Sequence, residues 1–282
     1  MGRLTQAANG HNWPTGRTKV ATVAFIHNFV VYPLPAQILP NANHAVLFFH
    51  AMRPRSLLLL TTVAVVVIWQ LPYGRQILYP LSLLATFAHE MGHGLSALLA
   101  GCKFEQLVLH ADGSGLAVWS GSPGRMATAF VAAGGLVGPT VAGVLMLLLS
   151  GTPRWSRGVL AALSALLVVC VVLWSGNAFG AVYLLAMATA FGLAARFFSD
   201  FLASFLVHLL AVTLCLSWFS NLGYLFSSHA VVDGVSHLSD SAVIAQALWL
   251  PYWFWGGLIA VFSLTGVLFG VWFSGRSAPR QG

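Results

Sequence analysis

The chain has 282 residues, of which 58% are hydrophobic and only 7% are Asp, Glu, Lys or Arg, against about 25% in an ordinary soluble domain. So little charge excludes a water-soluble globular protein, and three cysteines without a Cys-x-x-Cys pair exclude a disulfide scaffold. The composition is typical of a polytopic membrane protein, in which each of the six acidic residues needs a structural or chemical reason.

The first part of the chain differs from the rest. Its apolar stretch at residues 20–32 is shorter than the about 20 residues that span a bilayer, and it lacks the cleavage site of a signal peptide. Met52, followed by Arg-Pro-Arg and a long apolar run, resembles the start of a membrane protein. We therefore expect residues 1–51 to be a dispensable N-terminal extension, residues 52–275 to be the functional domain, and residues 276–282 to be a short polar tail.

Long apolar runs predict six or seven transmembrane helices. They lie at residues 56–74, 76–100, 126–150, 158–195, 201–226 and 250–273. The run at 158–195 is long enough for two helices, with a break at 175–180. Helices are expected because lipid cannot satisfy open backbone groups, so the predicted fold class is an all-α polytopic membrane protein. The third run contains AAGGLVGPTVAG, whose small residues let helices approach closely.

A short β-hairpin is predicted directly after the second span. Leu107, Leu109, Leu116 and Val118 alternate with other residues on either side of an Asp-Gly-Ser-Gly turn. This pattern predicts a membrane-associated hairpin over residues 103–119.

The charged residues favour lipid as the partner surface. The net charge of +7 suits contact with anionic lipid, and no basic run with interleaved aromatic residues indicates nucleic-acid binding. Basic residues fall on both sides of the predicted spans, so they do not determine the orientation. Glu105, Asp112 and Asp200 are expected at interfaces and turns.

The second predicted span contains His89-Glu90-Met91-Gly92-His93. Residues four apart on a helix lie about 40° apart around its axis, so both imidazoles point the same way. They can bind one Zn²⁺, with Glu90 placed to take a proton from a water molecule at the metal. Such a site can hydrolyse an amide bond.

Chance and simple packing are the alternative explanations of this motif. With ten histidines in the chain, chance would produce it about 0.002 times. Ionisable side chains in a span also oppose insertion and are functional by default. The sequence therefore predicts one zinc ion per chain, held in part by His89 and His93.

A hydrolytic zinc usually has three protein ligands, so a third is expected elsewhere. Asp240 precedes the last apolar region, where it could also stabilise the first turn of a helix. Asp233 lies in Val-Asp-Gly, where it could also belong to a turn. His110 and His237 are further candidates, although interfacial positions suit them better. Spacing alone does not choose between the two aspartates.

Three segments carry a resemblance to a known family: FAHEMGHGLSALLAGCKFEQLVLHADGSGLAVW, AAGGLVGPTVAG and SDSAVIAQAL. Over about residues 56–273 the chain resembles the bacterial branch of the site-2-protease-like intramembrane zinc metallopeptidases. The resemblance implies a third zinc ligand from an aspartate on a later helix, which the Ser-Asp-Ser element matches at Asp240. Better-studied members use Leu-Asp-Gly; Asp233 is the nearest match to it, without the preceding Asn-Pro, and stays the alternative.

The resemblance also implies a function. It predicts an integral membrane protease, in the inner membrane of a bacterium, that hydrolyses peptide bonds of transmembrane protein or peptide substrates with Glu90 as general base. The hairpin would offer a strand edge to an unwound substrate segment. The alternatives are a non-proteolytic zinc-containing scaffold or chaperone and, less favoured, a metal transporter. A transporter would need charged or titratable residues in several spans. Residues 158–195, which are long enough for two spans, contain no Asp, Glu, His, Lys or Arg.

Overall fold

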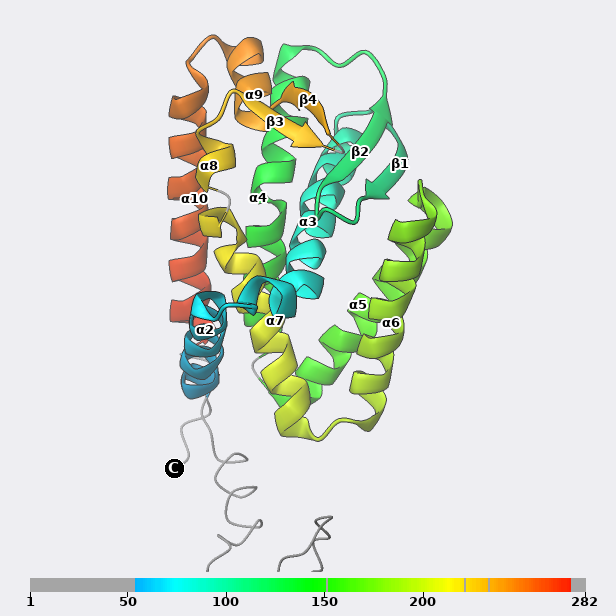
Figure 1. The fold of residues 1–282 in the computed structure, drawn as a ribbon, viewed down its shortest axis with the longest axis vertical. Helices are drawn as coiled ribbons and strands as arrows, with labels where there is room; N and C mark the ends of the chain where they lie inside the picture. The colour runs from blue at the N-terminus through cyan, green and yellow to red at the C-terminus, as the bar shows by residue number, and fades with distance from the viewer. Residues whose placement is uncertain (1–53, 151, 221, 233, 275–282) are drawn as a thin grey trace, which may run out of the picture. The chain divides into compact units, whose positions relative to one another are not determined.

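A computed structural model describes residues 54–150, 152–220, 222–232 and 234–274 (Figure 1). The expected extension at 1–51 and the expected tail at 276–282 lie outside the described residues.

The predicted spans correspond to seven long helices, two of which lie in the run at 158–195. These helices are α2 (Pro54–Gln70), α3 (Gly74–Leu99), α4 (Arg125–Leu149), α5 (Pro153–Trp174), α6 (Ala178–Phe197), α7 (Asp200–Ser220) and α10 (Tyr252–Ser274). Two short helices, α8 (Leu222–Leu225) and α9 (Asp240–Leu248), complete the helices of the described segments. The long run at 158–195 is indeed two helices. The all-α polytopic fold class is therefore confirmed.

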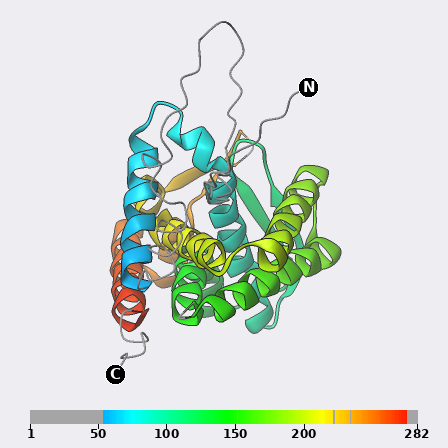
Figure 2. The ribbon, with the colours of Figure 1, turned by 90° about the horizontal axis from the view of Figure 1, so that it is seen from below.

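Length and composition separate these helices into two groups. Five of them, α4, α5, α6, α7 and α10, are long and apolar enough to cross a membrane. The apolar part of α2, Ser56–Gln70, is shorter, and α3 carries the polar residues of the His-Glu-x-x-His motif. In Figures 1 and 2, α3, α4 and α7 lie between the pair α2 and α10 and the pair α5 and α6.

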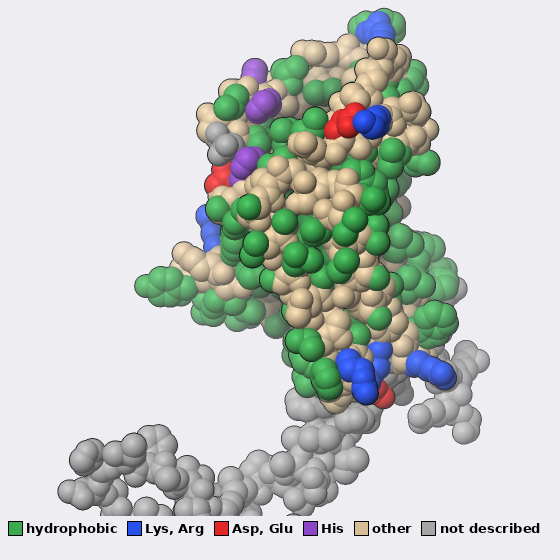
Figure 3. Space-filling model, turned by 90° about the vertical axis from the view of Figure 1, so that its right-hand side faces the viewer, with side chains coloured by type: hydrophobic (Ala, Val, Ile, Leu, Met, Phe, Trp, Pro, Cys, Tyr) green, Lys and Arg blue, Asp and Glu red, His purple; other side chains and the backbone are tan. Residues whose placement is uncertain are grey.

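The surface agrees with a membrane location. Val172 on α5 and Val182 on α6 are 77% and 68% exposed, as lipid-facing side chains would be. Figure 3 shows the right-hand side of the molecule as drawn in Figure 1. Hydrophobic side chains cover the middle of this face, and a group of Lys and Arg side chains lies at its lower end, with others nearer its top. The protein is a multi-pass integral membrane protein.

Small residues bring α3 and α4 close together. A side chain at Gly92 would overlap the backbone of Gly134, and a Cβ at Gly138 would lie 2.6 Å from the Ala88 carbonyl oxygen. Helices whose backbones approach this closely need glycine at the crossing. The packing role predicted for the small residues of the third run is confirmed.

The predicted hairpin is present as β1 (Lys103–Leu109) and β2 (Gly115–Ser120), which pair antiparallel. Its buried β1 side chains join the helical core, and the ring of Phe104 packs against Gly94 on α3. The outer edge of β1 is occupied, because the Gly176 N–H donates to the Leu107 carbonyl at 2.9 Å. The Asn177 side chain donates to the Leu109 carbonyl at 2.7 Å.

A second hairpin was not predicted. It consists of β3 (His229–Val232) and β4 (Val235–Leu238), which pair antiparallel through a turn at Gly234, where φ is +77°. Its strands have four residues each and are largely exposed, so they lack the alternation that reveals a longer strand in sequence. The hairpin extends toward β1 and β2 (Figure 1). A single residue, Ser239, separates the end of β4 from the start of α9.

Candidate metal centre

Helix α3 presents both histidines of the motif on one face. The Nε2 atoms of His89 and His93 lie 3.1 Å apart, and the two rings meet edge to face with centroids separated by 4.7 Å. The spacing of four residues produces this arrangement, because 3.6 residues complete one turn.

A hydrogen bond at Nδ1 of His93 indicates which nitrogen of this ring can bind a metal. Its Nδ1 lies 2.9 Å from the Val131 carbonyl oxygen on α4, which can only accept a hydrogen bond. Nδ1 therefore carries a proton, and in the neutral ring the Nε2 lone pair is available to bind a metal. Helix α4 reaches this position because Gly135 has no side chain there, since a Cβ would overlap the His93 ring.

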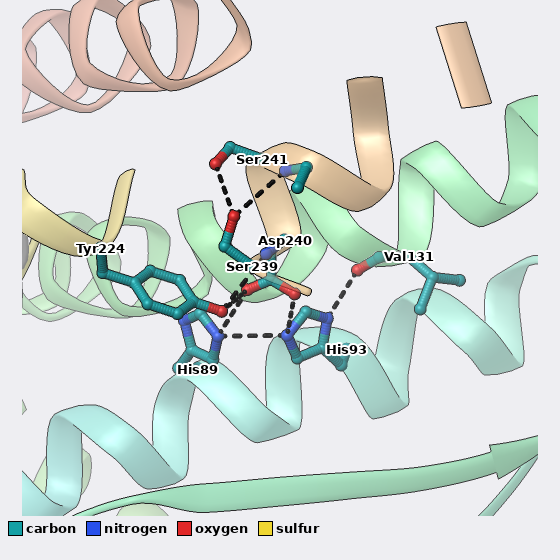
Figure 4. Close-up of polar contacts among 8 residues, drawn as sticks. His89, His93, Val131, Tyr224, Ser239, Asp240 and Ser241 are labelled. Atoms are coloured by element: carbon teal, nitrogen blue, oxygen red, sulfur yellow. Dashed lines mark hydrogen bonds and ion pairs between the residues drawn. The ribbon is translucent and has the colours of Figure 1, made fainter. Parts of the chain in front are cut away.

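The carboxylate of Asp240 completes the cluster. Its Oδ2 lies 3.0 Å from His89 Nε2, and its Oδ1 lies 3.3 Å from His93 Nε2 (Figure 4). Asp240 is the first residue of α9, where the Ser239 hydroxyl caps the helix by accepting a hydrogen bond from the Ala242 N–H at 3.2 Å. The same hydroxyl donates to the Ser227 carbonyl, which fastens the start of α9 to the preceding segment.

The spacing of these donors fits a metal ion. A tetrahedral Zn²⁺ with bonds of about 2.0–2.1 Å separates its ligand atoms by about 3.3–3.4 Å. The Nε2 atoms of His89 and His93 are 3.1 Å apart, close to this value, and one ligand atom from each of His89, His93 and Asp240 can be chosen so that all three lie within 4.8 Å of one another. Two neutral imidazoles and one carboxylate are also a donor set that Zn²⁺ uses in hydrolytic sites.

Tyr224 on α8 holds the Asp240 carboxylate. Its hydroxyl donates to Asp240 Oδ2 at 2.8 Å and accepts from the Asp240 backbone N–H at 3.3 Å. Its ring also meets the His89 ring edge to face, with centroids 6.0 Å apart. Tyr224 was not predicted from the sequence, because a tyrosine 16 positions before an aspartate carries no local signal.

Glu90 lies beside the cluster and under β2. Its side chain is 6% exposed, and its carboxylate accepts a hydrogen bond from the backbone of Ala117. A Cβ at Gly115 would lie 2.8 Å from Glu90 Cγ and 3.0 Å from its Oε1. The strand β2 therefore lies directly against the Glu90 side chain.

Two cavities meet at His89 and Glu90. One, of about 230 Å³, contains the ligand cluster and is also lined by Trp119 and Leu238; we call it the ligand cavity. The other, of about 260 Å³, has apolar side chains of α3, α4, α7 and α8 on part of its wall and the polar side chains of Thr86, Ser114 and Ser217 beside them; for its apolar part we call it the apolar cavity. Both are bordered by β2 on one side and by β3 on the other, with Tyr224 between them.

The other candidate ligands lie elsewhere. Asp233 is outside the described residues. His237 on β4 is exposed and lines the ligand cavity, but it is not a member of the cluster that could hold a metal. His110 begins the turn of the first hairpin, where its N–H donates to the Ser114 carbonyl.

The remaining acids have the structural positions expected of them. Glu105 pairs with Lys103 at 2.9 Å, and Asp200 pairs with Arg157 at 2.9 Å. In the hairpin turn, hydrogen bonds from the Ser114 hydroxyl and backbone N–H hold the pKa of Asp112 below its usual range.

Asn177 joins the start of α6 to the first hairpin. It caps α6 by accepting a hydrogen bond from the Gly180 N–H at 3.1 Å, and its amide holds the edge of β1. The structure therefore places Asn177 in a capping role.

Comparison with protein families links the chain to a group of peptidases. A family model described as Peptidase M50B-like matches residues 58–270, well over half of the chain. No curated protein and no solved structure matches the chain.

Proposed function

Because the chain belongs to the Peptidase M50B-like family, whose members are membrane metallopeptidases of the site-2 protease type, we propose that it is an intramembrane zinc metalloprotease. It would hydrolyse peptide bonds of transmembrane proteins or peptides in the inner membrane of a bacterium. The observation that carries the proposal is the meeting of two imidazoles from α3 and one carboxylate from α9 within 3.3 Å.

We assign the metal to His89, His93 and Asp240. The Nδ1 hydrogen bond of His93 favours the neutral tautomer whose Nε2 can bind a metal, and the Asp240 carboxylate is oriented by Tyr224. Three protein ligands leave a fourth position for water or substrate, which is the arrangement of catalytic rather than structural zinc. Bound there, Zn²⁺ would lower the pKa of water and polarise the substrate carbonyl.

We assign general base catalysis to Glu90. The residue follows a ligand directly in sequence, is buried, and lines both cavities at the point where they meet. Its carboxylate would take a proton from the attacking water as the new C–O bond forms. It would then pass that proton to the amide nitrogen as the C–N bond breaks, so no further acid is needed.

The substrate backbone is expected to pair with β2. The outer edge of β1 is already occupied by residues 175–177, whereas β2 borders both cavities with its other edge. An extended peptide can add a strand to such an edge. A transmembrane helix would have to unwind locally to do so, which agrees with cleavage of membrane-embedded substrates.

The decisive experiment uses the purified protein in liposomes with model transmembrane peptides. We expect the wild type to cleave a peptide and Glu90→Gln to lose cleavage while keeping its zinc, because Glu90 is not a ligand. His93→Ala and Asp240→Ala should lose both. Glu105→Gln, which replaces a partly exposed glutamate of β1 that pairs with Lys103, is the matched control and should behave as wild type.

The alternative function is a non-proteolytic membrane scaffold or chaperone with a structural zinc. It requires Glu90→Gln to be silent while His93→Ala is not. A glutamate that is 6% exposed beside the metal ligands is costly to bury, and a scaffold has no use for it. Cleavage by Glu90→Gln at the wild-type rate would reject the protease assignment.

A further inference from the structure

The apolar cavity opens beside the metal centre, with which it shares His89, Glu90 and Tyr224, and extends beyond it. Of the described residues that line it, Glu90 carries the only carboxylate, and none is Lys or Arg. Helices α3, α4, α7 and α8 contribute the apolar residues Ala85, Leu136, Pro139, Trp218 and Leu225, together with Thr86 and Ser217. None of these residues is used by the proposed reaction.

The position of the cavity relates it to the scissile bond. Ser114, directly before β2, lines the apolar cavity, Leu116 and Ala117 of β2 line the ligand cavity, and Gly115 lines both. Paired strands run side by side residue by residue, so a chain on β2 would pass from one cavity to the other within about two residues. A chain bound along β2 with its scissile bond at the metal would therefore place a nearby side chain at the mouth of the apolar cavity.

The size and lining of the cavity limit what can enter. Its volume of about 260 Å³ lies below the about 300–1,000 Å³ of pockets for drug-sized ligands, so it suits one large side chain. An anionic side chain would lose its hydration there and would share the cavity with the Glu90 carboxylate, with no Lys or Arg among the described lining residues to pair with it. A small side chain would leave most of the space unfilled.

We propose that the apolar cavity is a specificity pocket that accepts one large apolar side chain, such as Leu, Met or Phe, within two residues of the scissile bond. The inference rests on the proposed protease function, whose substrate class it narrows. A hydrophobic pocket discriminates by about 10- to 200-fold for each methylene group added or removed. Replacement of the large apolar residue by Ala or Asp should therefore lower the cleavage rate at least 10-fold.

The test combines a substrate series with cavity variants. Model transmembrane peptides carry Ala, Asp, Leu, Phe or Trp at each position around the cleavage site, and mass spectrometry identifies the cut. Leu136→Phe, which fills part of the cavity, should shift the preference toward Ala. Leu136→Ala, which enlarges it, should shift the preference toward Trp. Leu147→Phe is the matched control, because Leu147 is a buried leucine on the same helix that does not line the cavity.

Zinc content and thermal unfolding of each variant separate a change of specificity from loss of the fold. Opposite shifts in Leu136→Phe and Leu136→Ala, with the Leu147→Phe preference unchanged, would support the pocket. An identical side-chain preference in all four proteins would overturn it while leaving the protease function intact. If the wild type bound zinc and cleaved none of the peptides, the proposed function itself would fail, and the pocket with it.

Discussion

The Tyr224 hydroxyl donates a hydrogen bond to Asp240 Oδ2 at 2.8 Å and receives one from the Asp240 backbone N–H at 3.3 Å. Together these contacts hold the aspartate from both its side chain and its main chain. The oxygen that Tyr224 holds is also the one 3.0 Å from His89 Nε2. A tyrosine of α8 thus orients the carboxylate that we assign to the metal.

Replacing Tyr224 with Phe should weaken metal binding without removing a ligand. Partners of metal ligands contribute about 10- to 100-fold in metal affinity or activity, so we expect a loss of this size. Competition with a chromophoric chelator measures the affinity. Tyr183→Phe is the matched control, because its hydroxyl donates to the Pro80 carbonyl, away from the metal centre. Equal zinc affinity in the Tyr224 variant and the wild type would contradict the orienting role.

Gly115→Ala should impair catalysis while leaving the metal in place. The added Cβ would lie 2.8 Å from Glu90 Cγ, so the glutamate or β2 must move. A displacement of about 1 Å at a reacting group can cost about 100-fold in rate. We expect cleavage of the model peptides to fall by at least 10-fold, with zinc content unchanged. Gly158→Ala on α5, where a Cβ meets nothing within 4 Å, should have no effect on cleavage.

Ser239→Ala should loosen the start of α9. It removes the hydrogen bonds to the Ala242 N–H and to the Ser227 carbonyl, and loss of an N-cap costs about 0.5–2 kcal/mol. Because Asp240 follows directly, we expect zinc affinity to fall together with thermal stability. Ser199→Ala removes a similar cap, from the Leu202 N–H at the start of α7, and should lower stability alone. Parallel zinc affinities in the two variants would argue against this coupling.

Removal of the metal should be reversible and destabilising. The proposed ligands join α3 to α9, so a zinc ion bound only by the folded protein stabilises it by linkage. At 100 times the dissociation constant this amounts to about 2.7 kcal/mol. A chelator should abolish cleavage and lower the melting temperature, and added Zn²⁺ should restore both. His93→Ala should show little change in melting temperature on either treatment. A wild-type melting temperature insensitive to both would contradict a bound metal.

Local patterns in the sequence predicted the long helices, the first hairpin and the two histidines of the candidate metal centre. Apolar runs predicted six or seven long helices, alternation around a turn predicted β1 and β2, and a spacing of four placed His89 and His93 on one helical face. These features depend on residues close to one another in the chain, because helix and strand periodicity is a local property. The resemblance to a known family added the preference for Asp240.

The tertiary structure alone decided which distant residues meet. The approach of Asp240 to both imidazoles, the hold of Tyr224 on Asp240, and the contact of Gly115 with Glu90 all join segments far apart in the chain. Such contacts depend on how helices pack, and the short exposed strands β3 and β4 leave no periodic signal. The sequence by itself therefore determined a membrane helix bearing His-Glu-x-x-His, and packing decided what surrounds it.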